Sequence, residues 1–367
     1  MKSVELRAIW VLTLALALGS ACEKEKAAAP AAPKPVAQKA PAVQKAKVPT
    51  APASGPKKSD DACVGPVADS PTATIKFGEA SMERKGSTIT LQGTDPDDQF
   101  SIGQLSDVKD HTPKNIANIK VFLEWFKAQN VDAIVLNGDL GETQKGVEHI
   151  LNTVAEGSSV PVLAFVGNRE CKGDFNKAIA AVQKKYPQVV NMNTVRVFNA
   201  DDASIVSLPG YYNPTYLHCA EGCQYFPEDV ADLEKHAAKT TAPARVLAAH
   251  GPPRMKSPMG LDRIHDGVNV GDQDLANFLA AKKLFPFGLF GNIQEAGGHA
   301  TNLDGTKKIK EGVYADALYL NPGPSDPVPW TMLDGTSSIG MAGVLQIKGK
   351  QASYKVRRLK EGEAKVQ

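Results

Sequence analysis

The sequence has no apolar run long enough to cross a membrane, because its most apolar stretch, residues 8–18, is about half of the ~20 residues that a spanning helix needs. Aromatic residues make up only 6% of the chain, and none lies in residues 23–60. A basic stripe is also missing. The formal net charge of +2 comes from the first 60 residues, which leaves residues 61–367 at about −4 and argues against nucleic-acid binding.

The first residues have the pattern of an export signal. Lys2 and Arg7 precede the apolar stretch, and small residues run into Cys22. The stretch resembles a bacterial lipoprotein signal, in which such a cysteine becomes the acylated first residue, although Gly19 stands where leucine is usual. A plain secreted protein is the alternative. The resemblance predicts a signal peptide over residues 1–21, a lipid on Cys22 that holds the protein to a membrane, and a place in the bacterial cell envelope facing the periplasm or the cell surface.

A tether is expected to follow, over residues 22–60. Of the 38 residues from 23 to 60, 26 are Ala, Pro or Lys, so this segment cannot form a hydrophobic core and is best interpreted as a semi-rigid spacer. Residues 61–367 are long enough for one domain with a substantial core.

Cysteine usage agrees with export. Beyond Cys22 the chain has Cys63, Cys171, Cys219 and Cys223, an even number that allows disulfides in an oxidising compartment. We expect Cys219 to pair with Cys223 across "CAEGC", which leaves Cys63 for Cys171. A zinc site is the alternative, but a CxxxC without a second close pair is weak evidence for one.

Strand-like and helix-like patterns alternate along the domain. "TATIKFGEA" and "STITLQG", joined across "ERKG", and then "QFSIGQLSD" are expected strands. Thr112 and Pro113 predict a helix start, and helices are also expected around residues 147–154, 175–186 and 227–239. The last third is expected to be mostly strands. The order favours an α/β fold in which two sheets pack face to face with helices outside.

Polar residues stand at the ends of the predicted buried strands, where the loops of an α/β sheet form the ligand crevice. The stretches are, in order, "LSDVKD", "LNGDLGE", "VGNRE", "AAHGPP" and "GNIQE". They contain Asp107, Lys109, Asp139, Asn168, Arg169, His250, Asn292 and Gln294.

This order resembles the motifs of the calcineurin-like metallophosphoesterase family: Asp-x-His, Gly-Asp, Gly-Asn-His-Glu/Asp, a lone His, and Gly-His-x-His. The "LNPGP" stretch echoes the family's Asn-Pro-Gly-Ser turn. The resemblance spans about residues 72–357. It implies a two-sheet sandwich and two neighbouring metals bridged by the Gly-Asp carboxylate.

The resemblance places Asp107 and Asp139 at the first metal, and Asp139, Asn168, His250 and Asn292 at the second. Lys109, Arg169, Asn292 and Gln294 each stand where the family has a histidine, and Arg169 replaces the histidine that protonates the leaving group. We therefore expect an empty first position, with the ammonium of Lys109 between the carboxylates, because a protonated lysine is no metal ligand. The second position is left with at most one weakly held Mn, Mg, Ca or Fe ion.

Each of these residues also has a plain structural explanation, such as a turn cap or a satisfied core histidine. His111 and His299 are the candidates to replace missing ligands, but both are expected on exposed loops; His149 is expected on the outer face of a helix, and His218, His236 and His265 carry no motif. Lys109 and Arg169 suit an anion such as phosphate. The leading hypothesis is a catalytically impaired protein that binds an anionic ligand or an envelope partner, and the competing one is a phosphoesterase with a single metal.

Overall fold

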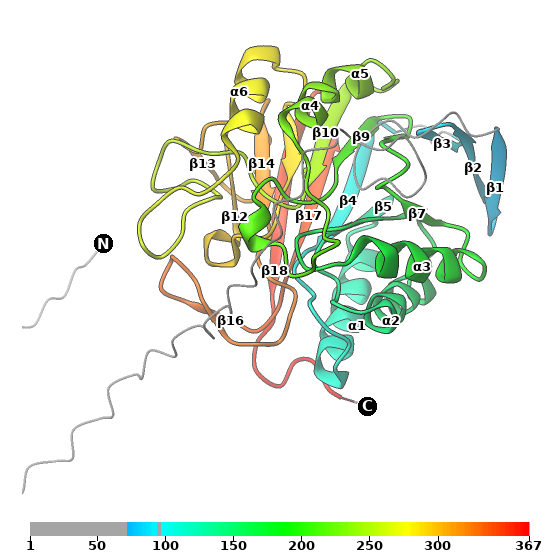
Figure 1. The fold of residues 1–367 in the computed structure, drawn as a ribbon, viewed down its shortest axis with the longest axis horizontal. Helices are drawn as coiled ribbons and strands as arrows, with labels where there is room; N and C mark the ends of the chain where they lie inside the picture. Colours follow the sequence, from blue (N-terminus) through cyan, green and yellow to red (C-terminus); the bar gives the residue numbers. More distant parts are fainter. Residues whose placement is uncertain (1–71, 94–96, 367) are drawn as a thin grey trace, which may run out of the picture. The chain divides into compact units, whose positions relative to one another are not determined.

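The computed structural model describes residues 72–93 and 97–366 (Figure 1). The predicted signal peptide, Cys22, the tether and Cys63 lie outside these residues. Among the helices of the described part, none is both long and apolar enough to cross a bilayer.

One sheet has six strands in the order β18-β17-β4-β5-β6-β7. Strands β4 to β7 are parallel, β17 pairs antiparallel with β4, and β18 pairs antiparallel with β17. Every residue of β5 is buried, as expected for a parallel strand that is covered on both faces. The strands are β4 (Gln99–Leu105), β5 (Ala133–Asn137), β6 (Val162–Phe165), β7 (Val189–Asn191), β17 (Met341–Lys348) and β18 (Gln351–Arg358).

The second sheet has ten strands in the order β1-β2-β3-β8-β9-β10-β11-β14-β12-β13. These are β1 (Ala73–Phe77), β2 (Ala80–Lys85), β3 (Thr88–Gln92), β8 (Val197–Asn199), β9 (Ala203–Leu208), β10 (Ala244–Ala249), β11 (Phe287–Leu289), β12 (His299–Thr301), β13 (Lys308–Ile309) and β14 (Leu318–Asn321). A separate hairpin joins β15 (Trp330–Thr331) and β16 (Ser337–Ser338).

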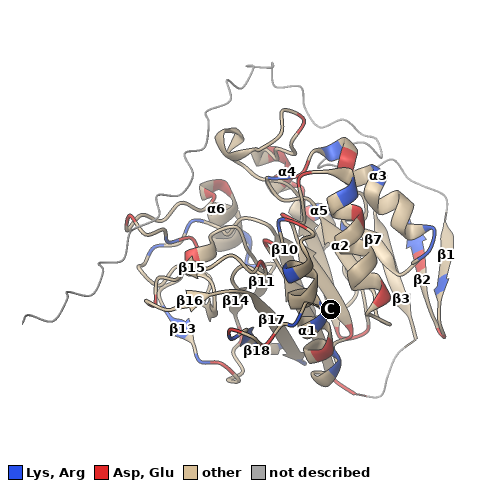
Figure 2. Cartoon of the chain, turned by 90° about the horizontal axis from the view of Figure 1, so that it is seen from below, with Lys and Arg blue, Asp and Glu red and all other residues tan. Residues whose placement is uncertain are grey.

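The core has three parts that follow from this layering. One cluster takes side chains from both sheets, among them Phe100, Phe165, Phe198 and Phe287. Two others lie where helices cover the outer faces of the sheets. The expected two-sheet α/β sandwich flanked by helices is therefore confirmed. Figure 2 shows acidic and basic residues interspersed along the helices and loops of the face in view.

Three helices cover the six-stranded sheet: α1 (Pro113–Ala128), α2 (Gln144–Glu156) and α3 (Lys172–Gln183). The predicted start of α1 is confirmed, since the Thr112 hydroxyl accepts a hydrogen bond from the Asn115 amide and Pro113 opens the helix. α4 (Pro227–Ala231), α5 (Leu233–Ala237) and α6 (Gln273–Lys282) lie over the other sheet.

Several predicted boundaries are wrong. "ERK" belongs to β2 and is no link between two strands, because Glu83 and Arg84 pair with β3 through the backbone ladder. The predicted single helix over 227–239 is two short helices with Asp232 between them. α6 was not predicted, because only Leu275 and Leu279 of its side chains are buried and the apolar period is weak.

Candidate metal and anion site

The predicted site residues gather at the carboxyl ends of β4, β5, β6, β10 and β11. One ligand atom each from Asp107, Asp139 and His250 lies within 4.8 Å of the others, and all three residues are buried. Asp107, Lys109, Asp139 and Asn292 have positive φ angles of 55°, 70°, 56° and 60°. Non-glycine residues rarely adopt this left-handed conformation, and such residues concentrate at functional sites.

Two glycines allow the motif loops to approach each other. A Cβ on Gly138, whose φ is +84°, would lie 2.7 Å from the Cα of Gly167. A Cβ on Gly167 would lie 2.4 Å from Asp139 Oδ1. The "LNGD" and "VGN" stretches therefore need glycine at these positions to bring Asp139 beside Asn168.

Asp107 is surrounded by protein donors. Its Oδ2 accepts hydrogen bonds from the Ser106 hydroxyl at 2.7 Å and from the Asn292 amide at 3.0 Å. Its Oδ1 accepts from the Gln294 side-chain amide at 3.2 Å. Both carboxylate oxygens are therefore already hydrogen-bonded within the protein.

Lys109 does not take its predicted place between the carboxylates. Its Nζ lies 2.5 Å from Asp326 Oδ2 and 2.8 Å from Gln294 Oε1, and 5.1 Å from the centre of the Trp330 ring. Among the described residues, Lys109 forms no ion pair with Asp107 or Asp139. Asp326 carries no signal in the family motifs and was missed. Burial raises the pKa of Asp326, although the nearby Lys109 ammonium opposes the rise.

These contacts do not fit a metal at the first position. An ammonium can only donate, so Gln294 must turn Oε1 toward Lys109 and its NH₂ toward Asp107. Gln294, one of the two residues that replace the family's histidines, therefore presents a donor to Asp107, where a metal ion would need a lone pair. The other, Lys109, donates to Gln294 and pairs with Asp326.

The second position differs, because Asp139 and Asn168 direct oxygen atoms toward the ring of His250. His250 Nδ1 lies 2.7 Å from the Asn137 carbonyl, to which it donates. The other ring nitrogen, Nε2, lies 2.9 Å from Asn168 Oδ1 and 3.3 Å from Asp139 Oδ1. Asn168 uses its NH₂ to donate to the Tyr216 carbonyl, so its oxygen faces His250.

With acceptors on both sides, Nε2 holds either a proton or a metal ion. Burial opposes the charged imidazolium, but the Asp139 carboxylate and its hydrogen bond raise the pKa of His250 to about 9. Burial also acts on Asp139, yet His250 and Arg169 lower the pKa of that carboxyl to about 2. Asp139, Asn168 and His250 fit one divalent cation. Asn292, the fourth predicted ligand, donates a hydrogen bond from its backbone amide to Asp107 Oδ2.

Arg169 lies on the rim of the crevice. Its Nε is 3.4 Å from Asp139 Oδ2, and its Nη1 is 2.8 Å from Glu142 Oε1. Its backbone amide and that of Asn168 each donate to Asp139 Oδ1 at 3.0 Å. The arginine thus lies beside the carboxylate that the family places between two metals.

Glu170, in the same motif, was not singled out from the sequence. Its carboxyl accepts hydrogen bonds from the backbone amides of Leu140 and Gly167 and is buried. Burial and the neighbouring Asp139 raise the pKa of Glu170 to about 7. It fastens the "LNGDLGE" loop to the "VGNRE" loop and so positions Asp139.

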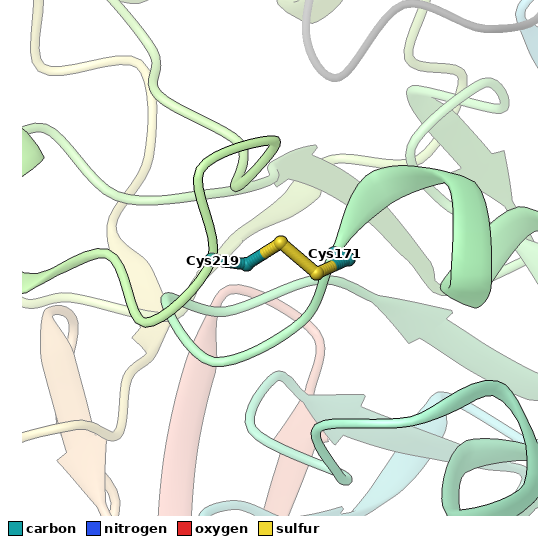
Figure 3. The surroundings of a disulfide bond; sticks show 2 residues. All are labelled: Cys171 and Cys219. Atoms are coloured by element: carbon teal, nitrogen blue, oxygen red, sulfur yellow. A yellow bond between two sulfur atoms is a disulfide. The ribbon is translucent and has the colours of Figure 1, made fainter. Parts of the chain in front are cut away.

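The predicted disulfides are wrong. Cys171 pairs with Cys219, with their Cα atoms 5.5 Å apart (Figure 3). This excludes both the Cys219–Cys223 and the Cys63–Cys171 pairs, and Cys223 is disulfide-bonded as well. Cys219 does not pair with Cys223 within the small loop. An isolated β-bridge between the backbones of Cys171 and Gly222 brings this loop to the start of α3.

Of the histidines considered as replacement ligands, His111 is exposed and its ring lies 5.5 Å from that of His149, which is also exposed on α2 as predicted. His299 is not on a loop; it opens β12, where its Nε2 lies 3.0 Å from the Met259 carbonyl. Neither belongs to the Asp107, Asp139 and His250 group.

The fold and this partial centre are those of the metallophosphoesterase fold class. The calcineurin-like phosphoesterase family matches residues 100–284, and the chain belongs to this family. No curated protein matches the sequence.

Three solved structures are similar to the chain at low identity. A dimetal phosphatase from Danio rerio is 11% identical, with a TM-score of 0.43 over 71% of this chain and 99% of that one. GAP50, described as the anchor in the inner membrane complex of Plasmodium, is 16% identical, with a TM-score of 0.46 over 72% and 86%. The purple acid phosphatase PPD1 from yellow lupin seeds is 11% identical, with a TM-score of 0.46 over 78% and 58%.

Proposed function

We propose that this chain is a binding protein built on the metallophosphoesterase fold, impaired in two-metal hydrolysis, and that it holds an anionic ligand or an envelope partner. The observation that carries the proposal is the 2.8 Å bond from Lys109 Nζ to Gln294 Oε1. The two positions at which the family has histidine ligands of its first metal are here bonded to each other.

Loss of that metal removes half of the catalytic apparatus. Two-metal hydrolysis needs one ion to generate hydroxide and both ions to stabilise the attacking and leaving oxygens. Arg169 stands at the position of the family's acid, and a guanidinium is a poor proton donor to a leaving group. At the family positions, the chain thus has neither the two histidine ligands of the first metal nor the histidine that protonates the leaving group.

A second candidate function is a phosphoesterase with one metal. The close grouping of Asp139 and His250 favours it, because their ligand atoms and the Asn168 oxygen suit a divalent ion. When bound, such an ion lowers the pKa of its water and polarises a phosphoryl oxygen. In this candidate Asp139, Asn168 and His250 hold the ion, while Arg169 orients the phosphate.

The envelope location is part of the proposal. The leader and Cys22 support a lipid anchor, and the Ala/Pro/Lys-rich tether supports a domain held away from the membrane surface. Acyl-chain labelling of wild-type protein and of Cys22→Ala, expressed in a bacterial host, tests the anchor. Equal labelling of the two would exclude acylation at Cys22.

The metal content of the purified protein separates the two functions. The protein is equilibrated with Mn²⁺, Fe²⁺, Zn²⁺ or Mg²⁺, freed of excess and measured by elemental mass spectrometry, and then assayed with phosphomonoesters and diesters. No turnover supports the binding protein. Turnover with about one metal per chain, both lost in Asp139→Ala and in His250→Ala, would replace it with the one-metal enzyme.

A further inference from the structure

Two donors on the rim of the crevice meet at one oxygen atom. Glu142 Oε1 lies 2.8 Å from Arg169 Nη1 and 3.2 Å from His218 Nδ1. The side chains are accessible, with exposed fractions of 26% for Arg169, 33% for His218 and 53% for Glu142. A carboxylate of the chain itself therefore occupies the point between a guanidinium and an imidazole.

The two donors are fixed relative to each other. Arg169 stands two residues before Cys171, His218 stands next to Cys219, and the Cys171–Cys219 disulfide joins the two segments (Figure 3). The His218 amide also donates to the Asn168 carbonyl at 2.9 Å. The crosslink thus holds His218, which belongs to no recognisable sequence motif, beside Arg169 of the "VGNRE" stretch.

Glu142 is held less firmly. It precedes Thr143, the N-cap of α2, so its side chain extends from a loop. Within the described residues its side chain contacts Arg169 and His218, and more than half of it is exposed. A more strongly bound anion can therefore displace this carboxylate without disturbing a helix or a strand.

We propose that Arg169 and His218 form an oxyanion-binding site, that Glu142 is its built-in occupant, and that the external ligand is a phosphate monoester group that displaces Glu142. This inference rests on the proposed function, for which it names the ligand class and two of the binding residues. His218 and Glu142 are additions to the residues that the motifs indicate.

The geometry favours phosphate over a second carboxylate. One phosphate oxygen takes the place of Glu142 Oε1, and another can reach Arg169 Nη2, for which no acceptor is found within the described ranges. Asp139 holds the guanidinium through Nε from the inner side, which leaves the outer edge of the fork for a multivalent oxyanion.

Glu142 also determines how strongly the site binds. While it occupies the site it competes for both donors, and after displacement its charge remains close to the ligand and repels it. We therefore expect weak phosphate binding by the wild type and a gain of about tenfold in affinity for Glu142→Gln, which keeps the size of the side chain and removes its charge. Glu142→Ala should show a similar gain.

The test is calorimetric titration of the purified full-length protein with inorganic phosphate at neutral pH. Glu124→Gln is the matched control, because Glu124 is an exposed carboxylate that pairs with Lys127 at 2.7 Å, and its removal should leave phosphate affinity unchanged. Arg169→Ala and His218→Ala, each made in the Glu142→Gln background, should lose the gain. Acetate should bind more weakly than phosphate to every variant.

The outcomes separate this inference from the proposed function. If neither Glu142 variant binds phosphate more tightly while Arg169→Ala abolishes binding, the chain has an anion site but Glu142 is not its occupant. If no variant binds phosphate, the Arg169–His218 site is excluded, while metal content and turnover still decide the proposed function. Binding of Glu142→Gln to phosphatidic acid vesicles, but not to phosphatidylcholine vesicles, would identify a lipid headgroup as the source of the phosphate monoester. Binding of free phosphate without binding to either kind of vesicle would identify a soluble source.

Discussion

Lys109 Nζ lies 2.5 Å from Asp326 Oδ2, and both side chains are largely buried, with exposed fractions of 14% and 2%. A cation that belongs to the chain therefore occupies the half of the crevice from which two metal-binding histidines are missing. The pair is further enclosed by Gln294 and the Trp330 ring. In this half of the crevice Lys109 neutralises Asp326, whereas Asp107 accepts hydrogen bonds from neutral donors.

Removal of the lysine should destabilise the fold. Lys109→Met leaves Asp326 buried without its partner, and loss of one member of a buried pair costs about 3 kcal/mol or more. Urea unfolding followed by circular dichroism measures the change. The matched control is Lys127→Met, which breaks the exposed pair with Glu124 and should change stability by less than about 1 kcal/mol. Equal effects of the two substitutions would show that the buried pair contributes no more to the free energy of unfolding than the exposed pair does.

Restoring the family ligands should restore metal binding at the first position. In Lys109→His with Gln294→His, two imidazoles face Asp107 and replace donors with lone pairs. The double variant should bind one more Mn²⁺ or Zn²⁺ per chain than the wild type by elemental mass spectrometry, whereas each single variant should not. An unchanged metal content in a folded double variant would mean that Asp326 and the surrounding loops also prevent metal binding.

The metal-free protein should lose stability as the pH rises above neutrality. The folded-state pKa of His250 is raised from 6.5 to about 9, so the stabilisation from its pair with Asp139 is fully present below about pH 6.5 and disappears as the pH passes about 9. The shift corresponds to about 3 kcal/mol. Urea unfolding in the presence of a chelator should show this slope for the wild type and a much weaker one for His250→Gln. A flat profile for the wild type would mean that His250 is neutral.

The Cys171–Cys219 crosslink should contribute strongly to stability. It closes a loop with a sequence separation of 48, for which chain entropy predicts about 4 kcal/mol. Cys171→Ser with Cys219→Ser should lower the unfolding midpoint accordingly and weaken phosphate binding by Glu142→Gln, because His218 is then no longer held beside Arg169. Retention of that binding in a folded double variant would show that hydrogen bonds alone position His218.

Sequence patterns predicted the sheet sandwich and most of the crevice because both follow from the order of neighbouring strands and helices along the chain. Alternating buried strands and helices determine the layers, and residues such as Asp139, Asn168 and His250 directly follow the strands that position them. The partners that decide the chemistry are distant in sequence. Asp326 follows β14 and reaches Lys109 across more than 200 residues, and no motif marks it.

The wrong disulfide pairing has a similar cause. Only three residues lie between Cys219 and Cys223, so loop length alone favours a disulfide between them. The structure instead brings Cys219 to Cys171 through backbone contacts such as Lys172 to Glu221, and these depend on the tertiary path of the segment. His218 was left without a role for the same reason, since only this path places it beside Arg169.

Four residues of the crevice have backbone angles in the left-handed region, and this conformation affects how the crevice binds a ligand. Asp107, Lys109, Asp139 and Asn292 hold unfavourable backbone angles, and hydrogen bonds within the protein maintain them. These loops have therefore already lost their conformational entropy during folding. A ligand that enters the crevice meets a rigid surface, and its affinity is not reduced by the ordering of the backbone around it.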